Sequence, residues 1–369
     1  MDNPRILIAA GGTGGHVYPA ISIADAIRSE HQNAEILFVG TKNHMEWTAV
    51  PKAGYEIVNV WISGFHRRLT LKNLLFPFKL ITSLIQSANI LRKFRPQVTV
   101  SCGGYVAGPV GWVAAKSGIP IVIQEQNSYP GVTNRMLAKD AEKIFTAFEG
   151  ASKYFPKEKI QLSGNPVRSV LRSADKKEAL KSLNFISDKP VLLILGGSGG
   201  ARSINQAMLE NITSLHDELG LQILWQCGPR YYEGLSAEMD LNKLENLKLT
   251  PYIDKMPEAY AAADLVISRA GASSCSELMM TGKPSVLVPS PNVAGDHQTE
   301  NAKSMVEAGA SELLPDEKMK DVLVDLVKEL IHDQEKLKKM NQAALKLAKP
   351  DAAKEIAREI LNIAKTRLN

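Results

Sequence analysis

Short apolar runs alternate along the chain with stretches whose apolar residues recur at helical spacing. Apolar runs of four to six residues without alternating polar positions are typical of strands buried on both faces of a parallel sheet. In the first half of the chain we expect strands at residues 6–10, 35–39, 98–101, 119–124 and 143–146. In the second half we expect them at residues 191–195, 222–226, 247–249, 265–268 and 285–288. Helical patterns between these runs, for example at residues 19–29 and 203–209, predict an α/β protein whose parallel sheets are covered by helices on both faces.

Two glycine-rich turns stand at matching places in the two halves. GGTGGH (11–16) and GGSGGAR (196–202) each follow an apolar run and lead into a helical pattern, about one domain length apart. Glycine reaches positive φ and has no Cβ, so backbone N–H groups and a helix N-terminus can close around phosphate oxygens. The repetition predicts two similar lobes, each with an anion-binding turn, although a tight turn without a ligand would show the same residues.

The division of these lobes follows from the breaks in the pattern, which we place at SGNPVR (163–168) and in the lysine-rich helical tail that Pro350 divides. We therefore predict an N-terminal lobe over 1–165, a C-terminal lobe over 166–345, and a last helix over 346–369 that packs back on the first lobe. A chain of 369 residues is long enough for two domains.

Composition narrows the class of protein. Hydrophobic residues make up 44% of the chain and charged residues 22%, which is ordinary for a globular protein. The three cysteines form no CxxC pair, so we expect a reducing compartment. The chain shows no signal-peptide pattern and no apolar run of about 20 residues, so we expect it in the cytoplasm, with any membrane contact peripheral.

The net charge of +5 is unevenly distributed. Residues 57–124 contain no Asp or Glu and eight Lys or Arg residues. Within them, residues 77–94 show apolar positions at helical spacing, preceded by LTLKNLLFPF (69–78). A core helix with solvated basic ends would fit this pattern, and so would a helix that rests on an anionic membrane surface. The apolar clustering of the aromatic residues does not favour nucleic-acid binding.

The two turns lack the sequence motifs of two common classes of phosphate-binding site, so they disfavour the ligands of those sites. A dinucleotide-binding turn needs GxGxxG, but Val17 stands at the third glycine position, and the second expected strand ends at Gly40 rather than an acidic residue. A P-loop needs a lysine that neither turn contains. A nucleotide sugar, whose diphosphate needs neither signature, fits two such lobes.

Eight motifs then resemble one family in order and spacing. They are GGTGGHVYPA (11–20), SCGGYVAGP (101–109), EQN (125–127), GNPVR (164–168), GGSGGAR (196–202), YIDKM (252–256), SRAGASSCSE (268–277) and DHQTENA (296–302). Over about residues 6–310 the chain resembles the MurG family of bacterial peptidoglycan N-acetylglucosaminyltransferases. The resemblance implies a GT-B fold, with two Rossmann-like lobes whose parallel sheets face a central cleft. It also implies transfer of GlcNAc from UDP-GlcNAc to the muramoyl C4 hydroxyl of lipid I, the undecaprenyl-diphosphate intermediate, which gives lipid II in peptidoglycan synthesis.

The resemblance also implies which residues bind UDP-GlcNAc. Ser198 is expected at the donor phosphates, Arg168 at the phosphate or uracil, and Ile253 at the uracil through its backbone. Glu277 is expected to accept hydrogen bonds from the ribose hydroxyls, and Asn127 and Gln298, with His297, to hold GlcNAc. The remaining residues expected at the donor are Thr13, Gly14, Gly15, Ala272 and Ser273.

Attack by a sugar hydroxyl needs a proton acceptor, and imidazole titrates close to neutral pH. His16, the last residue of the first turn, is our preferred base, and Glu125 is the rival base or a residue that orients the acceptor. A single displacement inverts the anomeric centre.

Acceptor binding is predicted less directly. Gly14 and Gly15, together with Gly103, Gly104 and Tyr105, are the residues that we expect to hold the acceptor diphosphate. Two features depart from the family: Gln124 stands where many members have histidine, and SGFHRRLT (63–70) differs from the usual glycine-rich basic loop. We interpret His31, His44, His216 and His332 as surface or packing residues.

No metal or cofactor is expected, because the chain has no DxD, no HExxH and only scattered histidines. The expected partners are UDP-GlcNAc, lipid I, the cytoplasmic face of the anionic inner membrane and other proteins of cell-wall synthesis. Two alternatives remain at this point. One is another GT-B-like enzyme, such as a UDP-GlcNAc 2-epimerase or a glycolipid transferase. The other is a non-catalytic membrane adaptor that binds a UDP-sugar.

Overall fold

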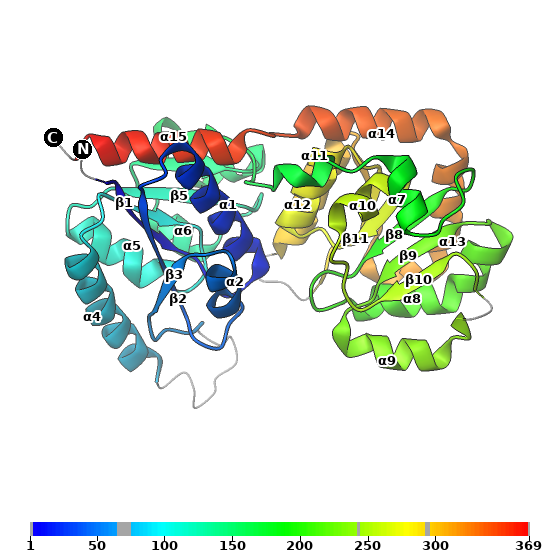
Figure 1. Ribbon diagram of the computed structural model, residues 1–369, viewed down its shortest axis with the longest axis horizontal. Helices are drawn as coiled ribbons and strands as arrows, with labels where there is room; N and C mark the ends of the chain where they lie inside the picture. Colours follow the sequence, from blue (N-terminus) through cyan, green and yellow to red (C-terminus); the bar gives the residue numbers. More distant parts are fainter. Residues whose placement is uncertain (1–2, 65–74, 242–243, 292–295, 368–369) are drawn as a thin grey trace. The chain divides into compact units, whose positions relative to one another are not determined.

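The computed structural model describes residues 3–64, 75–241, 244–291 and 296–367. Its contacts divide the chain into two compact units (Figure 1). The first unit consists of Met1–Val167 and Lys349–Asn369, and the second unit of Arg168–Ala348. The chain therefore leaves the first unit at Val167 and returns to it at Lys349.

The described residues of the first unit form a seven-stranded parallel sheet with the order β3-β2-β1-β4-β5-β6-β7. The strands are β1 (Arg5–Ala9), β2 (Glu35–Gly40), β3 (Glu56–Asn59), β4 (Val98–Ser101), β5 (Ile121–Glu125), β6 (Lys143–Thr146) and β7 (Ile160–Leu162). The helices are α1 (Gly14–Glu30), α2 (Glu46–Lys52), α4 (Phe76–Phe94), α5 (Ala107–Lys116), α6 (Val132–Leu137) and α15 (Ala352–Lys365). The sheet has a topological switch point between β1 and β4, where the loops leaving the two strands diverge.

The first sheet is buried on both faces, as its unbroken apolar strands predict. On β1, Ile6 and Ile8 face a core that includes apolar residues of α1 and α15. Leu7 and Ala9 face a second core beneath α4 and α5. Successive strand side chains point to opposite faces, so this five-residue strand belongs to two cores at once.

The described part of the second unit contains a six-stranded parallel sheet with the order β10-β9-β8-β11-β12-β13. The strands are β8 (Val191–Leu195), β9 (Gln222–Gln226), β10 (Leu247–Thr250), β11 (Leu265–Ser268), β12 (Ser285–Leu287) and β13 (Ser311–Leu313). The helices are α7 (Lys176–Ser182), α8 (Arg202–Thr213), α9 (Pro229–Glu238), α10 (Met256–Ala262), α11 (Ala272–Thr281), α12 (His297–Glu307), α13 (Met319–His332) and α14 (Gln334–Leu347). Its switch point lies between β8 and β11.

The predicted α/β class with parallel sheets is confirmed in both units. The pattern missed three edge strands, β3, β7 and β13, which are short and only partly apolar. The first helix begins at Gly14 rather than at residue 19, and Pro19 lies inside it. Glycines and an internal proline disfavour a helix in isolation, so packing of Val17 and Ala20 in the core outweighs their local preference.

The last helix, α15, packs against α1 in the first unit, and the two helices lie side by side in Figure 1. Ile356, Ala357, Ile360 and Ala364 of α15 are fully buried there. One apolar stripe of α15 therefore completes the core on that face of the first sheet.

Ile360→Ala should remove most of a fully buried side chain from this core and lower the free energy of unfolding by about 2–5 kcal/mol. Amide hydrogen exchange would localise the loss, with faster exchange in β1 than in the wild type and unchanged exchange in β8. Lys354→Ala, at an exposed position of the same helix, should change stability by less than about 0.5 kcal/mol. Equal effects of Ile360→Ala on β1 and β8 would contradict this assignment of α15 to the first unit.

Candidate functional site

The first glycine turn follows β1 at the switch point of the first sheet. Gly12 has φ +91°, a conformation that favours glycine. Its N–H donates to Glu46 Oε2 at 3.1 Å, and the other oxygen of Glu46 accepts from the N–H of Thr41 at 3.1 Å and from its hydroxyl at 2.6 Å. Glu46 is fully buried, so one carboxylate ties the loop after β1 to the loop after β2.

Because the N–H of Gly12 already donates to Glu46, any anion at this turn would accept from the next N–H groups along the chain. Gly14 and Gly15 form the first turn of α1, where an α-helix offers its N–H groups no internal acceptor. Thr13 is the N-cap residue, and its side chain makes no capping hydrogen bond. The N–H groups at the start of α1 can therefore bind an anion.

His16 lies in the first turn of α1 and is partly buried. Its Nδ1 atom is 2.9 Å from Oε1 of Gln126, in the loop after β5. Gly103, at φ +97°, faces the same nitrogen, and a Cβ at this position would lie 2.9 Å from Nδ1. The loops after β1, β4 and β5 thus converge on one imidazole.

Gly104 allows the loop after β4 to approach the first glycine turn. A Cβ on Gly104, at φ +83°, would lie 2.3 Å from the carbonyl oxygen of Gly11. Tyr105 follows with its ring 59% exposed. The structure thus brings the five residues expected at the acceptor diphosphate together at the carboxyl ends of β1 and β4. They are Gly14, Gly15, Gly103, Gly104 and Tyr105.

Glu125 lies at the end of β5 and is buried. Its Oε1 accepts from the N–H of Asn127 at 2.9 Å and from the side-chain amide of Asn127 at 3.3 Å. Its Oε2 accepts from the N–H of Gly131 at 3.1 Å and from the amide of Asn134 at 2.9 Å. Both oxygens are thus engaged in shaping the loop between β5 and α6.

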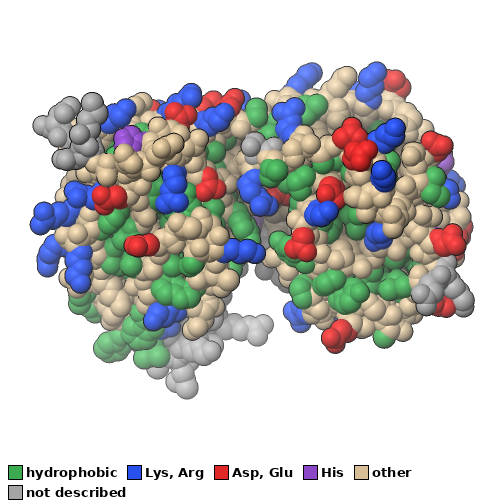
Figure 2. Space-filling view, in the orientation of Figure 1, with side chains coloured by type: hydrophobic (Ala, Val, Ile, Leu, Met, Phe, Trp, Pro, Cys, Tyr) green, Lys and Arg blue, Asp and Glu red, His purple; other side chains and the backbone are tan. Residues whose placement is uncertain are grey.

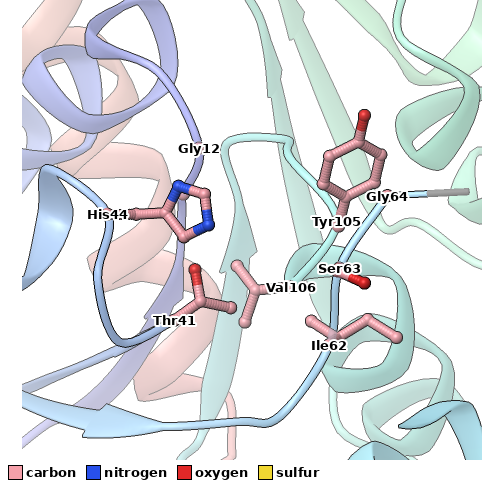
Figure 3. A pocket seen from close by; sticks show the side chains of 9 residues that line it. Gly12, Thr41, His44, Ile62, Ser63, Gly64, Tyr105 and Val106 are labelled. Atoms are coloured by element: carbon pink, nitrogen blue, oxygen red, sulfur yellow. The ribbon is translucent and has the colours of Figure 1, made fainter. Parts of the chain in front are cut away.

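A pocket of about 300 Å³ opens beside the first glycine turn. It is lined by Gly11, Gly12, Thr41, His44, Ile62, Ser63, Gly64, Tyr105 and Val106. In Figure 3 His44 and Tyr105 approach it from opposite sides, with Val106 between them and Ile62 below Tyr105. Ser63 accepts a hydrogen bond from Lys79 Nζ at 2.9 Å, which links the pocket wall to α4. His44, which the sequence assigned to the surface or to packing, is exposed and lines this pocket.

The second glycine turn follows β8 and is built by the same kind of close approach. Gly197 and Gly200 have φ +80° and +76°, and the N–H of Gly200 donates to the carbonyl of Gly197 at 3.0 Å. A Cβ on Gly200 would lie 2.1 Å from the carbonyl oxygen of Cys227. Ser198, between these glycines, is exposed.

Gln226, at the end of β9, connects this turn to the loop after β10. Its buried side-chain amide donates to the carbonyl of Gly197 at 3.0 Å and to that of Pro251 at 3.2 Å. Ile253 lies two residues beyond Pro251, so Gln226 fixes the turn expected at the phosphates and the loop expected at the uracil together.

Glu277 lies on α11, partly buried, and its Oε2 accepts a hydrogen bond from the hydroxyl of Tyr260 at 2.8 Å. Burial raises the pKa of Glu277, while the hydrogen bond from Tyr260 and the positive charge of Arg168 act against this rise. Burial, and next the Glu277 carboxylate, raise the pKa of the Tyr260 phenol. Arg168 itself is exposed. The structure thus brings Arg168 within electrostatic range of Glu277, and Tyr260 holds one of its oxygens.

The start of α11 carries two further predicted residues. Ala272 is the first residue of the helix and is buried, and the Oγ of Ser273 is buried without a hydrogen-bond partner among the described residues. Gln298, in the first turn of α12, accepts at Oε1 from the N–H of Ser290 at 2.9 Å. His297 is the first residue of α12.

Arg269 holds the elements around the second turn in place. It forms an ion pair with Asp316 and donates to the Ser203 hydroxyl at 2.7 Å, which in turn donates to Asp316 at 2.6 Å. This cluster joins the end of β11 to the first turn of α8.

In the part of the chain that the structure describes, no group of three or more His, Cys, Asp or Glu residues could hold a metal ion. The three cysteines are buried and unpaired, and burial raises the pKa of Cys275 to about 12. No described helix is long and apolar enough to cross a membrane.

Sequence motifs pointed to most of these positions, but not to several residues that organise them. Glu46, Gln126, Asn134, Gln226 and Tyr260 were not singled out. Gln126 lies inside the EQN motif, so its place between Glu125 and Asn127 was an available signal. The others carry no local pattern that separates a buried hydrogen-bonding side chain from a solvated one.

Comparison with known proteins now decides the family. The model of the glycosyltransferase family 28 N-terminal domain matches residues 6–146, and that of the family 28 C-terminal domain matches residues 191–356. The chain belongs to glycosyltransferase family 28.

A sequence relative and a solved structure each match nearly the whole chain. A Flavobacterium psychrophilum protein is 44% identical over 369 residues, all of both chains, and is named UDP-N-acetylglucosamine--N-acetylmuramyl-(pentapeptide) pyrophosphoryl-undecaprenol N-acetylglucosamine transferase. The crystal structure of Acinetobacter baumannii MurG matches with a TM-score of 0.78 and 28% identity, over 97% of this chain and 99% of that one. The GT-B fold and the family predicted from the sequence are thereby confirmed.

A more distant match shows the fold alone. The UDP-GlcNAc 2-epimerase from Neisseria meningitidis, bound to UDP-GlcNAc, is 17% identical, with a TM-score of 0.65 over 97% of this chain and 100% of that one.

Proposed function

We propose that this protein transfers GlcNAc from UDP-GlcNAc to the muramoyl C4 hydroxyl of lipid I, with inversion, and so forms lipid II. The observation that carries this proposal is the 44% identity, over the full length of both chains, to a transferase named for that donor and that acceptor. Within each unit, the loops that converge at the glycine turn supply a chemically suitable set of residues for it.

We assign the donor mainly to the second unit. Its diphosphate would accept hydrogen bonds from Ser198 and the backbone of the second glycine turn, with Arg168 supplying positive charge at the phosphate or uracil. Ile253 would meet the uracil through its backbone. Ala272 and Ser273 would lie at the nucleotide, where the N-terminus of α11 favours negative charge.

Glu277 is well arranged to bind the ribose. Tyr260 occupies its Oε2, so Oε1 is the oxygen that would accept a ribose hydroxyl. Gln298 would donate to GlcNAc through its NH₂ group, since its carbonyl already accepts from Ser290, and His297 would lie beside it. Asn127, Thr13, Gly14 and Gly15 complete the set that we assign to the donor.

We assign the acceptor to the first unit, with its diphosphate at Gly14, Gly15, Gly103, Gly104 and Tyr105. The C4 oxygen would attack the anomeric carbon of GlcNAc while the bond from that carbon to the phosphate oxygen breaks. UDP would leave with the electron pair, and the hydroxyl proton would pass to a base. One displacement of this kind inverts the anomeric centre and needs no covalent enzyme intermediate.

His16 is the stronger candidate for this base. Its imidazole is partly exposed and makes one hydrogen bond among the described residues, through Nδ1. Glu125 is buried and accepts four hydrogen bonds from the loop that it shapes. We therefore give Glu125 a structural role and His16 the proton.

A membrane surface is the third partner that we propose. On α4, Phe78 is 66% exposed, Ile81 58% and Ile85 59%. In Figure 2 hydrophobic side chains gather at the lower end of α4, and lysine and arginine side chains follow toward its other end. Apolar side chains beside cations suit the cytoplasmic face of an anionic inner membrane, to which the protein would bind peripherally. The basic residues 67, 68 and 72 lie outside the described part of the chain.

The transfer itself can be measured with labelled UDP-GlcNAc and lipid I in detergent. Wild-type protein should form lipid II, and His16→Ala should lower kcat by about 10²- to 10⁴-fold, because general-base catalysis is lost. His332→Ala, an exposed histidine on α13, should leave kcat unchanged. Turnover of UDP-GlcNAc without lipid I would indicate an epimerase, and UDP binding without any transfer would indicate an adaptor. Either result would overturn the proposal.

The role of Glu277 predicts a pH effect on UDP binding. Tyr260→Phe removes a hydrogen bond that lowers the pKa of Glu277, so that pKa should rise further and the carboxylate should be lost at a higher pH. Calorimetry should show UDP affinity that is about twofold to tenfold weaker at neutral pH. The decline on acidification should begin at a higher pH than in the wild type. Tyr232→Phe is the matched control, and a wild-type profile for Tyr260→Phe would refute the assignment.

Flotation with anionic vesicles tests the surface of α4. Phe78→Ser and Ile81→Ser should each weaken partitioning about tenfold, because burial of one such side chain contributes about 1.5–3 kcal/mol. Ile186→Ser, which changes an apolar residue that is 47% exposed in the second unit, should have no effect. Undiminished flotation of both α4 variants would exclude this surface as the membrane contact.

A further inference from the structure

A chain of buried amide side chains leads to His16 from the interior of the first unit. Asn165, Gln124 and Gln126 are each at most 4% exposed. Gln124 Nε2 is 2.9 Å from Asn165 Oδ1, Gln126 Nε2 is 2.5 Å from Gln124 Oε1, and Gln126 Oε1 is 2.9 Å from His16 Nδ1. These contacts connect three separate motifs of the sequence.

Backbone carbonyls, which can only accept, fix the direction of each hydrogen bond in this row of three amide side chains. Asn165 must turn its NH₂ group to the carbonyl of Gln126, at 3.1 Å, so its oxygen faces Gln124. The NH₂ group of Gln124 must then donate to Asn165, so the side-chain oxygen of Gln124 faces Gln126.

Two backbone carbonyls also fix the orientation of the Gln126 amide, independently of Asn165. Its NH₂ group is 2.7 Å from the carbonyl of Cys102 and 3.1 Å from that of Gln124. Two carbonyl oxygens on this side exclude the opposite amide orientation, so the oxygen of Gln126 must face His16.

An amide oxygen has no proton to donate, so the nitrogen of His16 that faces it must carry one. We propose that Gln126 is a positioning residue that holds neutral His16 as the Nδ1–H tautomer and leaves Nε2 as the atom that accepts the proton. The inference rests on the proposed role of His16 in the transfer and names the reacting atom. Gly103 contributes by leaving room for Nδ1, where a Cβ would lie at 2.9 Å.

The partner of the imidazole is therefore an amide rather than a carboxylate. The neighbouring carboxylate, Glu125, is turned toward Asn127, Gly131 and Asn134. An amide dipole orients the ring and selects the tautomer, but it gives the imidazolium less stabilisation than a full negative charge would. His16 can thus return its proton after each transfer without opposing a buried ion pair.

The tautomer can be measured without any activity, which separates this inference from the proposed function. Nitrogen-15 NMR of histidine-labelled protein at about pH 8, where imidazole is largely neutral, distinguishes the protonated nitrogen from the bare one. His16→Ala identifies the signal. We expect the His16 proton on Nδ1. A proton on Nε2 would overturn the inference even if the protein transfers GlcNAc, and failure to transfer would leave the NMR result standing.

Gln126→Met keeps a side chain of similar length but removes the amide. It should release His16 to a mixture of tautomers and lower kcat about tenfold to a hundredfold, with KM for UDP-GlcNAc within about twofold of the wild-type value. Gln124→Met is the matched control, because both backbone carbonyls still orient Gln126, and it should keep the Nδ1–H tautomer.

A double variant distinguishes positioning from a general structural effect. If Gln126 acts through His16, then Gln126→Met should cost little further activity in a His16→Ala background. An equal loss of kcat in both backgrounds would show that Gln126 acts elsewhere. The wild-type tautomer remains a complete test if Gln126→Met does not fold.

Discussion

In each unit, the close approach of two loop backbones at the end of the central strand is the constraint on which the candidate site residues of that unit depend. In the first unit the loop after β4 lies against the carbonyl of Gly11, and in the second unit the loop after β9 lies against the turn at Gly200. A side chain at either place would overlap a backbone oxygen. The glycines therefore determine which loops can meet in each unit.

Buried carboxylates beside the first glycine turn hold loops together. Glu46 and Glu125 are both buried, both accept several hydrogen bonds, and neither forms an ion pair with a described residue. Their negative charge is stabilised by N–H and hydroxyl groups of the loops themselves. The groups that remain accessible beside them are an imidazole and backbone amides, which suit proton transfer and anion binding.

Local pattern predicted the parts of the molecule that local forces determine. The central strands, the glycine turns and α4 were placed within a few residues, because unbroken apolar runs and helical spacing report burial directly. The edge strand β13 and the early start of α1 were missed, because there tertiary packing outweighs residue preference. Motifs pointed to His16 and Glu277 as candidate site residues, but their hydrogen-bond partners Gln126 and Tyr260 are far from them in sequence or carry no pattern of their own. A hydrogen bond across 110 residues follows from topology, which sequence spacing alone does not give.

The return of the chain to the first unit bears on how the protein folds during synthesis. Residues 349–369 are synthesised after the whole second unit, yet Ile356 and Ile360 fill the core against α1 and β1, which are synthesised before it. Until these residues are made, α15 cannot cover its face of the first sheet, whereas every residue of the second unit has already been made. The second unit is therefore the one that can complete its fold first, and the nascent first unit exposes apolar residues of α1 and β1 that α15 later covers.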